Sequence, residues 1–248
     1  MILVTGDTHG FCDSDEVARF SRHNKPFWDG LGVLTKDDYV IICGDFGLVW
    51  AGSEEEQYWL EWLRAKPFTT LFLDGNHENF DRLAAFPVET WHGGQVQTVA
   101  PGILHLMRGQ VYELDGRRLF VLGGAQSHDI EGRVPGKTWW PQELPTEDDF
   151  AAARRALDAC GWTVDDVLTH SLPTSLQRVM YDDPDAYPGN RLTDFLDEVY
   201  ARLTFQNWYS GHYHVDGRMR VDPRVRVIYH ELRDPVRDAD AHKKVDGC

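Results

Sequence analysis

Residues 1–10 read MILVTGDTHG, and this stretch sets a pattern that recurs along the chain. An apolar run of strand length, residues 2–5, ends at Gly6 and is followed at once by Asp7 and His9. A short run of β-branched and large apolar side chains is typical of a strand that is buried on both faces. The polar residues are therefore expected at the carboxyl end of a buried strand.

Four later runs end in the same way, each in residues that can bind a metal ion. They are DYVIICGD at residues 38–45, TTLFLDGNH at 69–77, DDVLTH at 165–170 and NWYSGHYH at 207–214. Patterns that predict helices lie at residues 53–66, 79–86, 146–160 and 191–203. Because predicted strands alternate with predicted helices, the fold class is expected to be α/β.

Residues 96–124 differ from this pattern. They alternate in polarity and turn at Arg108-Gly109 and at Asp115-Gly116. Such alternation around glycine turns predicts β-hairpins, so antiparallel strands are expected beside the parallel ones. The sheet or sheets should therefore be mixed.

The composition bounds the size and the partners of the protein. At 248 residues without a Pro/Gly-rich linker, we expect one domain over residues 1–232, followed by a loose polar tail over residues 233–248. With 25 Lys and Arg against 40 Asp and Glu, the net charge of −15 disfavours broad binding to nucleic acid or to an anionic membrane. Four cysteines without a CxxC motif, no signal-peptide pattern and no membrane-length apolar run favour a cytoplasmic protein.

The five strand ends are expected to meet, because sites in open α/β sheets form beyond the carboxyl ends of the strands. The shared site would contain Asp7, His9, Asp45, Asn76, His77, His170, His212 and His214. Carboxylate, imidazole and amide donors suit divalent Mn, Fe, Zn, Co or Ni. With His77 set aside, seven ligands remain, which is too many for one ion but suits two ions that share a bridging carboxylate. Two such ions would outweigh the two aspartates and attract a phosphate.

In their order along residues 7–214, these motifs resemble the calcineurin-like metallophosphoesterase superfamily. The motifs are Asp7-Thr8-His9, Gly44-Asp45, Gly75-Asn76-His77-Glu78, His170 and Gly211-His212-Tyr213-His214. The resemblance implies a sandwich of two mixed β-sheets flanked by helices, with a dinuclear metal site at its edge. It also implies a phosphoesterase in which a hydroxide that bridges two metal ions, with manganese favoured, attacks the phosphorus of a mono- or diester.

The resemblance further implies a place for each ligand. The first ion would be held by Asp7, His9 and His214. The second ion would be held by Asn76, His170 and His212, and Asp45 would bridge the two.

His77 would be the catalytic residue that protonates the leaving oxygen or stabilises the transition state. The group that orients His77 is left open, with Asp74 and Glu78 as the nearest carboxylates in sequence. Phosphoprotein phosphatases of the superfamily carry an aspartate and an arginine shortly after the Gly-Asp pair. Residues 46–50 here read FGLVW, which disfavours a protein serine/threonine phosphatase.

Specificity is expected from the loops, and a phosphorylated small molecule is the favoured substrate. Arg82 and Arg133 are candidates for contact with a substrate phosphate. Trp139-Trp140 either packs under a loop or forms a stacking wall for a substrate ring. Nucleotides, cyclic nucleotides, dinucleoside polyphosphates and phospholipid-type esters all remain open. The alternatives to this function are a non-catalytic interaction scaffold and a nuclease that acts on short nucleic acid.

Overall fold

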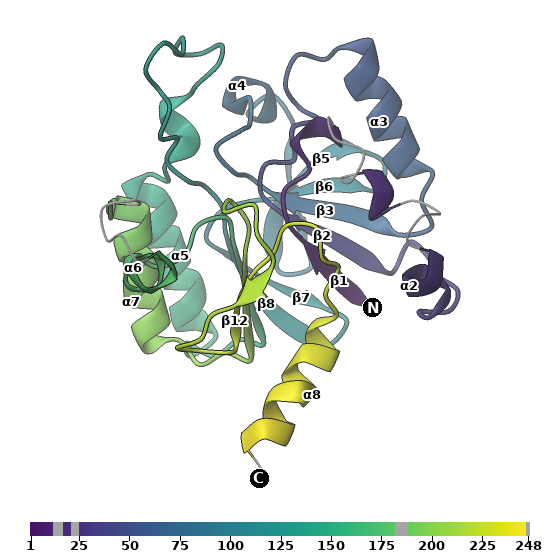
Figure 1. Cartoon of the computed structure of the whole chain (residues 1–248). Coiled ribbons are helices and arrows are strands. Elements are labelled where there is room, and N and C mark those ends of the chain that lie inside the picture. The colour runs from purple at the N-terminus through teal and green to yellow at the C-terminus, as the bar shows by residue number, and fades with distance from the viewer. Residues whose placement is uncertain (12–16, 21–24, 182–187, 247–248) are drawn as a thin grey trace.

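The computed structural model describes residues 1–11, 17–20, 25–181 and 188–246, and two six-stranded β-sheets form its centre (Figure 1). The first sheet has the spatial order β1 (Ile2–Thr5), β2 (Tyr39–Cys43), β3 (Thr69–Leu73), β6 (Ile103–Leu106), β5 (Gly94–Ala100) and β4 (Val88–Trp91). The second has the order β11 (Gly217–Arg218), β12 (Val225–Val227), β10 (Asn207–Ser210), β9 (Asp166–Thr169), β8 (Arg117–Leu122) and β7 (Gln110–Leu114). Four neighbouring strands in each sheet are parallel and the others are antiparallel, which confirms the prediction of mixed sheets.

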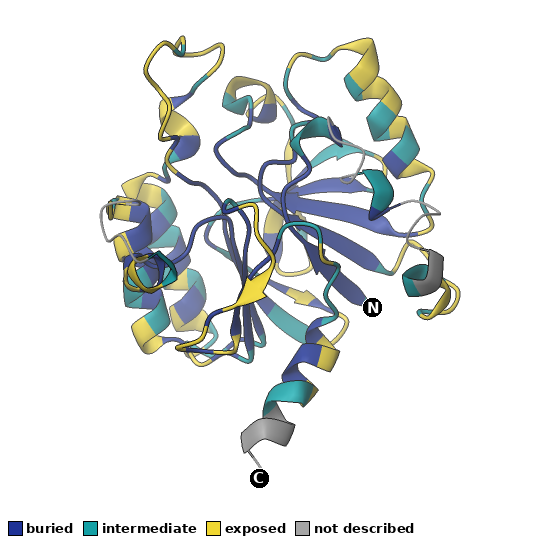
Figure 2. Cartoon of the chain, viewed as in Figure 1, coloured by how far each residue is buried: buried dark blue, intermediate teal, exposed yellow. Residues whose placement is uncertain are grey.

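Apolar side chains fill the space between the two sheets, and most strand residues are buried (Figure 2). Ile41 and Leu71 from the first sheet belong to the same cluster as Leu168 and Tyr209 from the second. Helix α3 (Glu54–Arg64) contributes to the cluster on the outer face of the first sheet. The outer face of the second sheet packs against α5 (Glu147–Ala159), α6 (Thr174–Met180) and α7 (Arg191–Arg202). Burial of both strand faces is what the continuous apolar runs predicted.

Side-chain caps begin the longer helices where the sequence places them. Ser53 accepts a hydrogen bond from the Glu56 amide at α3, and Thr146 and Asn190 form capping boxes at α5 and α7. The remaining short elements are η1 (His9–Phe11), α2 (Lys25–Asp29), α4 (Phe80–Leu83) and η3 (Pro141–Glu143). No helix among the described residues combines the length and the apolar character needed to cross a bilayer.

The predicted meander at residues 96–124 is divided between the two sheets. β5 and β6 pair in the first sheet, and β7 and β8 pair in the second. The turn at Asp115-Gly116 is a true hairpin turn, with φ of 49° and 73° as a two-residue turn prefers. Arg108-Gly109 instead lies on the crossover from one sheet to the other. Local turn chemistry cannot distinguish these two outcomes.

The C-terminal segment differs from the expected loose tail, because α8 (Pro235–Asp246) is a helix that contacts β1 and β10. Its Asp238 is buried and accepts a hydrogen bond from Tyr209 at 2.8 Å. Asp238 also forms ion pairs with Arg226 at 3.2 Å and with Arg233. The polar character of the segment thus includes a charge, that of Asp238, which lies in a buried ion pair. Residues 247–248 lie outside the described part.

Candidate metal centre

Five strands from the two sheets end at one edge of the sandwich, and most of the predicted ligands follow these ends directly. β1, β2 and β3 are parallel neighbours in the first sheet, and β9 and β10 are parallel neighbours in the second. The residues that follow them are Asp7, Asp45, Asn76, His170, His212 and His214. The topology thus brings together side chains that lie up to about two hundred residues apart in sequence.

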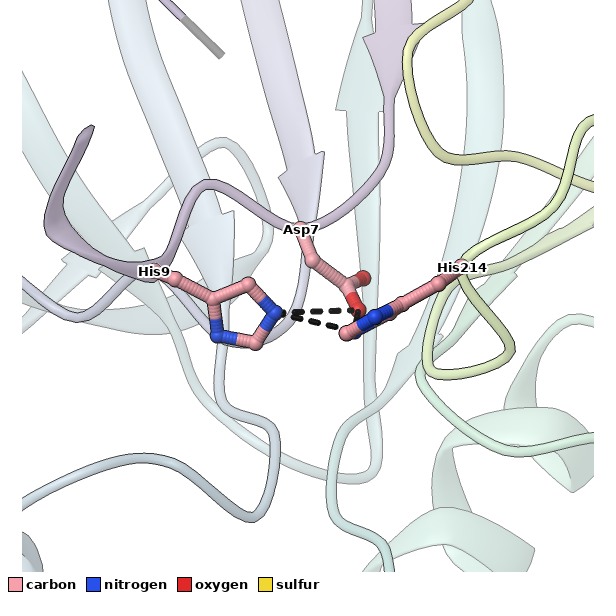
Figure 3. Close-up of side chains that lie close together, drawn as sticks. All are labelled: Asp7, His9 and His214. Carbon is pink, nitrogen blue, oxygen red and sulfur yellow. Dashed lines mark hydrogen bonds and ion pairs between the residues drawn. The ribbon is translucent and has the colours of Figure 1, made fainter. Parts of the chain in front are cut away.

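Asp7, His9 and His214 point toward one another, as Figure 3 shows. The distance from Asp7 Oδ2 is 3.2 Å to His214 Nε2 and 3.8 Å to His9 Nε2. The two imidazole nitrogens are 2.9 Å apart. One ligand atom from each of the three residues therefore lies within 4.8 Å of the others, as a common cation requires.

His170 lies at the centre of a second, fully buried group. Its Nε2 is 3.3 Å from Asp45 Oδ1 and 3.2 Å from Asn76 Oδ1. Its Nδ1 is 2.8 Å from the carbonyl oxygen of Cys43, to which it donates. That hydrogen bond leaves the Nε2 lone pair of the neutral ring to face the other donors.

Asp45 lies between the two groups. One of its oxygens faces His170, and the other lies 3.9 Å from His9 Nδ1. The His212 ring, with its centroid 5.0 Å from that of His170, lies beside the second group. The backbone amide of His212 donates to Asp7 Oδ1 at 3.1 Å, which ties the two sheets together at the site.

Strained backbone is concentrated among the predicted ligands. Among the described residues, eight non-glycine residues have positive φ, and four of them belong to the site. These are His9 at 42°, Asp45 at 48°, His212 at 74° and His214 at 51°. Such conformations cost on the order of 1 kcal/mol or more each and persist where the surrounding structure holds them. The fold holds these side chains in place against local backbone preference.

Two glycines allow the strand ends to approach the carboxylates closely. A Cβ atom at Gly75 would lie 2.0 Å from Asp45 Oδ1, and one at Gly211 would lie 2.3 Å from Asp7 Oδ1. Neither distance is compatible with a side chain. The glycines that precede two of the predicted ligands, Asn76 and His212, therefore have a steric cause.

The order and the geometry of the site agree with a known family. A model of the calcineurin-like phosphoesterase family matches residues 1–216. The chain belongs to this family. It is accordingly a phosphoester hydrolase, and its relatives are metal-dependent.

Solved structures resemble the phosphoesterase at low sequence identity. The protein TT1561 of Thermus thermophilus is 12% identical with a TM-score of 0.50, and 96% of this chain and 95% of that one are covered, which shows a shared fold. Phosphopantetheinyl hydrolase (PptH) from Mycobacterium tuberculosis is 18% identical with a TM-score of 0.45, over 98% and 92% of the two chains. A putative 5'-nucleotidase from Staphylococcus aureus, crystallised with alpha-ketoglutarate, is 17% identical with a TM-score of 0.47, over 92% and 48%. No curated protein matches the sequence.

The donor set of the phosphoesterase fits divalent cations. Asp7 and Asp45 are almost completely buried, and a buried charge needs an opposite charge nearby. Imidazole, carboxylate and amide donors suit Mn, Fe, Co, Ni or Zn, and no thiolate joins them among the described residues. The contact of His170 with a backbone carbonyl is the kind of second contact that orients a ligating imidazole.

The protonation states of the histidines in the phosphoesterase site are compatible with binding of a cation. Burial lowers the pKa of His212 to about 3 and lowers that of His9, so both imidazoles are neutral at pH 7. Burial also opposes charge on His170, but Asp45 and Asp7 outweigh it and raise the pKa of His170 to about 10. A cation at these carboxylates would take the place of the His170 proton, because ligating imidazoles are neutral.

His77 lies beside the first group, with its ring centroid 5.4 Å from that of His9. Its backbone amide donates to Asp45 Oδ1 at 2.8 Å. Neither of the two carboxylates considered as its orienting partners hydrogen-bonds His77 in the described part of the chain, although Glu78 Oε2 is buried without a partner there. Asp74 binds Arg108 and His105, and Glu78 accepts a hydrogen bond from the Phe46 amide at 2.7 Å.

A pocket of about 350 Å³ opens next to His9 and His77. Its other lining residues are Gly10, Gly47, Trp50, Ser53, Glu55 and Glu56. No lysine or arginine among the described residues lines it.

Neither of the two arginines proposed for substrate contact is among the residues that line this pocket. Arg82 is exposed and donates to the Ala51 carbonyl at 3.2 Å. Arg133 binds Asp129 at 2.6 Å within its own loop. Trp140 is buried, and its Nε1 donates to Asp81 at 2.8 Å, so for this residue the packing alternative is confirmed.

Sequence reasoning missed Ser127 and His128. The His128 ring is centred 6.1 Å from that of His212, and Ser127 accepts a hydrogen bond from Asn76. Both follow the apolar run that forms β8, which ends in polar residues as the other five runs do. The four residues between β8 and Ser127, residues 123–126, made that signal weaker.

Proposed function

We propose that the chain hydrolyses a phosphate mono- or diester of a small molecule with two divalent cations, of which manganese is favoured. The ligands would be Asp7, His9 and His214 for one cation, Asn76, His170 and His212 for the other, and Asp45 for both. The observation that carries this proposal is the place of the Asp45 carboxylate, with one oxygen toward His170 and the other toward His9.

The protein residues then have distinct tasks. When bound, two divalent cations supply Lewis-acid activation of water and neutralise phosphoryl oxygens. His77 donates a proton to the leaving oxygen, a role supported by its place beside the first ligand group and in the lining of the pocket. Asp45 holds the His77 loop through its hydrogen bond to the backbone amide, so this ligand would fix the position of the proton donor.

We further propose that the leaving group carries no additional phosphate. The pocket beside His77 is lined by Glu55 and Glu56, and Glu56 is already held by the backbone amides of residues 50–52. Glu55 keeps an exposed charge, which would repel an anionic leaving group. Alcohol or phenol leaving groups fit this lining better than a nucleoside diphosphate does.

Hydrolysis of bis-p-nitrophenyl phosphate and p-nitrophenyl phosphate with added Mn²⁺ tests the activity. His77→Ala should lower kcat by about 10²-fold or more while metal content stays unchanged. Asp45→Asn should lose both metal and activity. His92→Ala, in an exposed turn where it binds the Glu113 carbonyl, serves as the control. A wild-type protein that stays inactive with Mn, Fe, Co, Ni and Zn would contradict the proposal.

ATP tests the leaving-group preference. The value of kcat/KM should be higher for p-nitrophenyl phosphate than for ATP, and Glu55→Lys should narrow this difference. Glu55→Gln is the matched neutral control. Faster hydrolysis of ATP by the wild type would show that the pocket does not select against charge.

A further inference from the structure

We propose that Ser127 and Glu143 form a positioning relay that fixes the side-chain amide of Asn76, with its oxygen toward the second cation. The inference rests on the proposed function, because it assigns Asn76 as a ligand. The two relay residues flank the loop at residues 128–142, and both are separated from Asn76 by more than fifty residues of sequence.

Three contacts form the relay. Asn76 Nδ2 donates to Ser127 Oγ at 3.2 Å, and the Ser127 backbone amide donates to Glu143 Oε2 at 3.0 Å. On the opposite side, Asn76 Oδ1 lies 3.2 Å from His170 Nε2. The exposed fractions of Asn76, Ser127 and Glu143 are 5%, 3% and 2%, so water does not compete for these groups.

The chemistry of an amide makes this orientation decisive. Only the oxygen of an asparagine side chain has a lone pair that can bind a cation, whereas the nitrogen carries two hydrogens and binds none. A buried acceptor next to the nitrogen fixes which end faces the site. If that acceptor is removed, the flipped amide becomes accessible and presents N–H groups to the cation. Ser127 Oγ is this acceptor, because the Ser127 side chain also hydrogen-bonds the Glu143 carboxylate, which accepts the hydroxyl hydrogen.

Glu143 contacts two residues that lie next to Asn76 or to its loop, namely Ser127 and Arg108. Its carboxylate binds the Ser127 amide, and its carbonyl oxygen accepts a hydrogen bond from Arg108 at 3.3 Å. Arg108 also binds the carboxylate of Asp74, two residues before Asn76. Burial of a carboxylate is unfavourable unless its oxygens are bound, and the other oxygen of Glu143 has no hydrogen-bond partner among the described residues. The task that these contacts indicate for Glu143 is to hold Ser127 against Asn76.

Titration of the metal-free protein with Mn²⁺ in a calorimeter tests the relay. We expect Ser127→Ala to weaken the second Mn²⁺ by about 10–100-fold, as loss of a group that orients a ligand does, while the first affinity stays within about threefold. Ser127→Thr keeps the hydroxyl and should restore the second affinity. Glu143→Gln keeps an acceptor for the Ser127 amide and should resemble the wild type, whereas Glu143→Leu should resemble Ser127→Ala.

Thr174→Val is the matched control, because it removes a buried hydroxyl that binds Thr193 and Asp194, on the helices that cover the second sheet. Unchanged affinity for both Mn²⁺ ions in Ser127→Ala would overturn the relay. An equal loss at both sites would also overturn it, since that result indicates general destabilisation. A wild type that binds no Mn²⁺ would instead contradict the proposed function, so the two failures are distinguishable.

Discussion

Gly75 shows at the residue scale how closely the first sheet approaches the site. A Cβ atom there would lie 2.5 Å from the backbone nitrogen of Asp45 and 2.7 Å from His170 Nε2, and the backbone atom has no room to move. The constraint is steric and does not depend on φ, since Gly75 is not among the glycines with positive φ. The position therefore accepts only glycine, although its backbone conformation is ordinary.

Gly75→Ala is expected to lower the free energy of unfolding by about 1–3 kcal/mol and to abolish tight Mn²⁺ binding, because the added methyl group displaces Asp45. Urea denaturation and Mn²⁺ titration measure the two effects. Gly217→Ala is the control, since nothing lies within 4 Å of a Cβ atom there, and it should change stability by less than about 0.5 kcal/mol. Equal behaviour of the two variants would contradict the steric account.

Helix α8 shows at the element scale how a polar segment becomes part of the core. Asp238 is 2% exposed, and it binds Arg226, which is 6% exposed on β12. In the sequence, Arg226 is the last of four closely spaced arginines, Arg218, Arg220, Arg224 and Arg226, whose alternation favours a solvated strand face. In the structure, α8 covers Arg226. The charge of Arg226 is neutralised by Asp238, which lies twelve positions later in the sequence.

Asp238→Ala is expected to destabilise the protein by about 3–5 kcal/mol, because it leaves the Arg226 guanidinium buried without its main partner. Thermal and urea unfolding measure the loss. Arg237→Ala on the same helix breaks an exposed pair with Asp234 and should cost less than about 1 kcal/mol. If Asp238→Ala unfolds like Arg237→Ala, then α8 does not contribute to the folded core.

At the scale of the whole molecule, the crossover from β6 to β7 joins the two sheets close to the site. Arg108 lies in this crossover and binds Asp74, which follows β3. His105 Nε2 lies 3.2 Å from the other oxygen of Asp74, and His105 Nδ1 lies 2.9 Å from Gln97 Oε1. A charged network thus links the first sheet, the crossover and the loop that carries Asn76.

The Asp74 network predicts how stability depends on pH. Burial would raise the pKa of Asp74, but Arg108 and His105 outweigh it and lower that pKa to about 2. Because the folded pKa lies below the unfolded value of about 4, the stabilisation is present above pH 4 and is lost as pH falls toward 2. The difference in unfolding free energy between wild type and Asp74→Asn should shrink by about 2 kcal/mol from pH 5 to pH 2. Urea titrations of chelator-treated protein measure it, and a constant difference would contradict the network.

Much of the architecture can be predicted from local patterns, and the reason differs between elements. Ser53 and Thr146 cap helices because capping needs only a side chain and a nearby amide. The doubly buried strands are predictable because their apolar runs are continuous. The hairpin turn expected at Arg108-Gly109 is wrong, because a turn does not reveal which sheet the next strand joins. The loose tail expected from residue 233 onward is also wrong, because the polar sequence of a helix does not reveal its buried ion-pair partner.

The sequence by itself determined the class of the protein, because the ligand types and the glycines before them follow strand ends in a fixed order. Only the tertiary structure decided which groups orient those ligands. Ser127 reaches Asn76, and the Cys43 carbonyl oxygen reaches His170, across 51 and 127 residues of chain. Such contacts form because strand ends from two sheets meet at one edge of the sandwich. The local pattern of a sequence predicts each strand, but it does not predict which strand ends come close together in space.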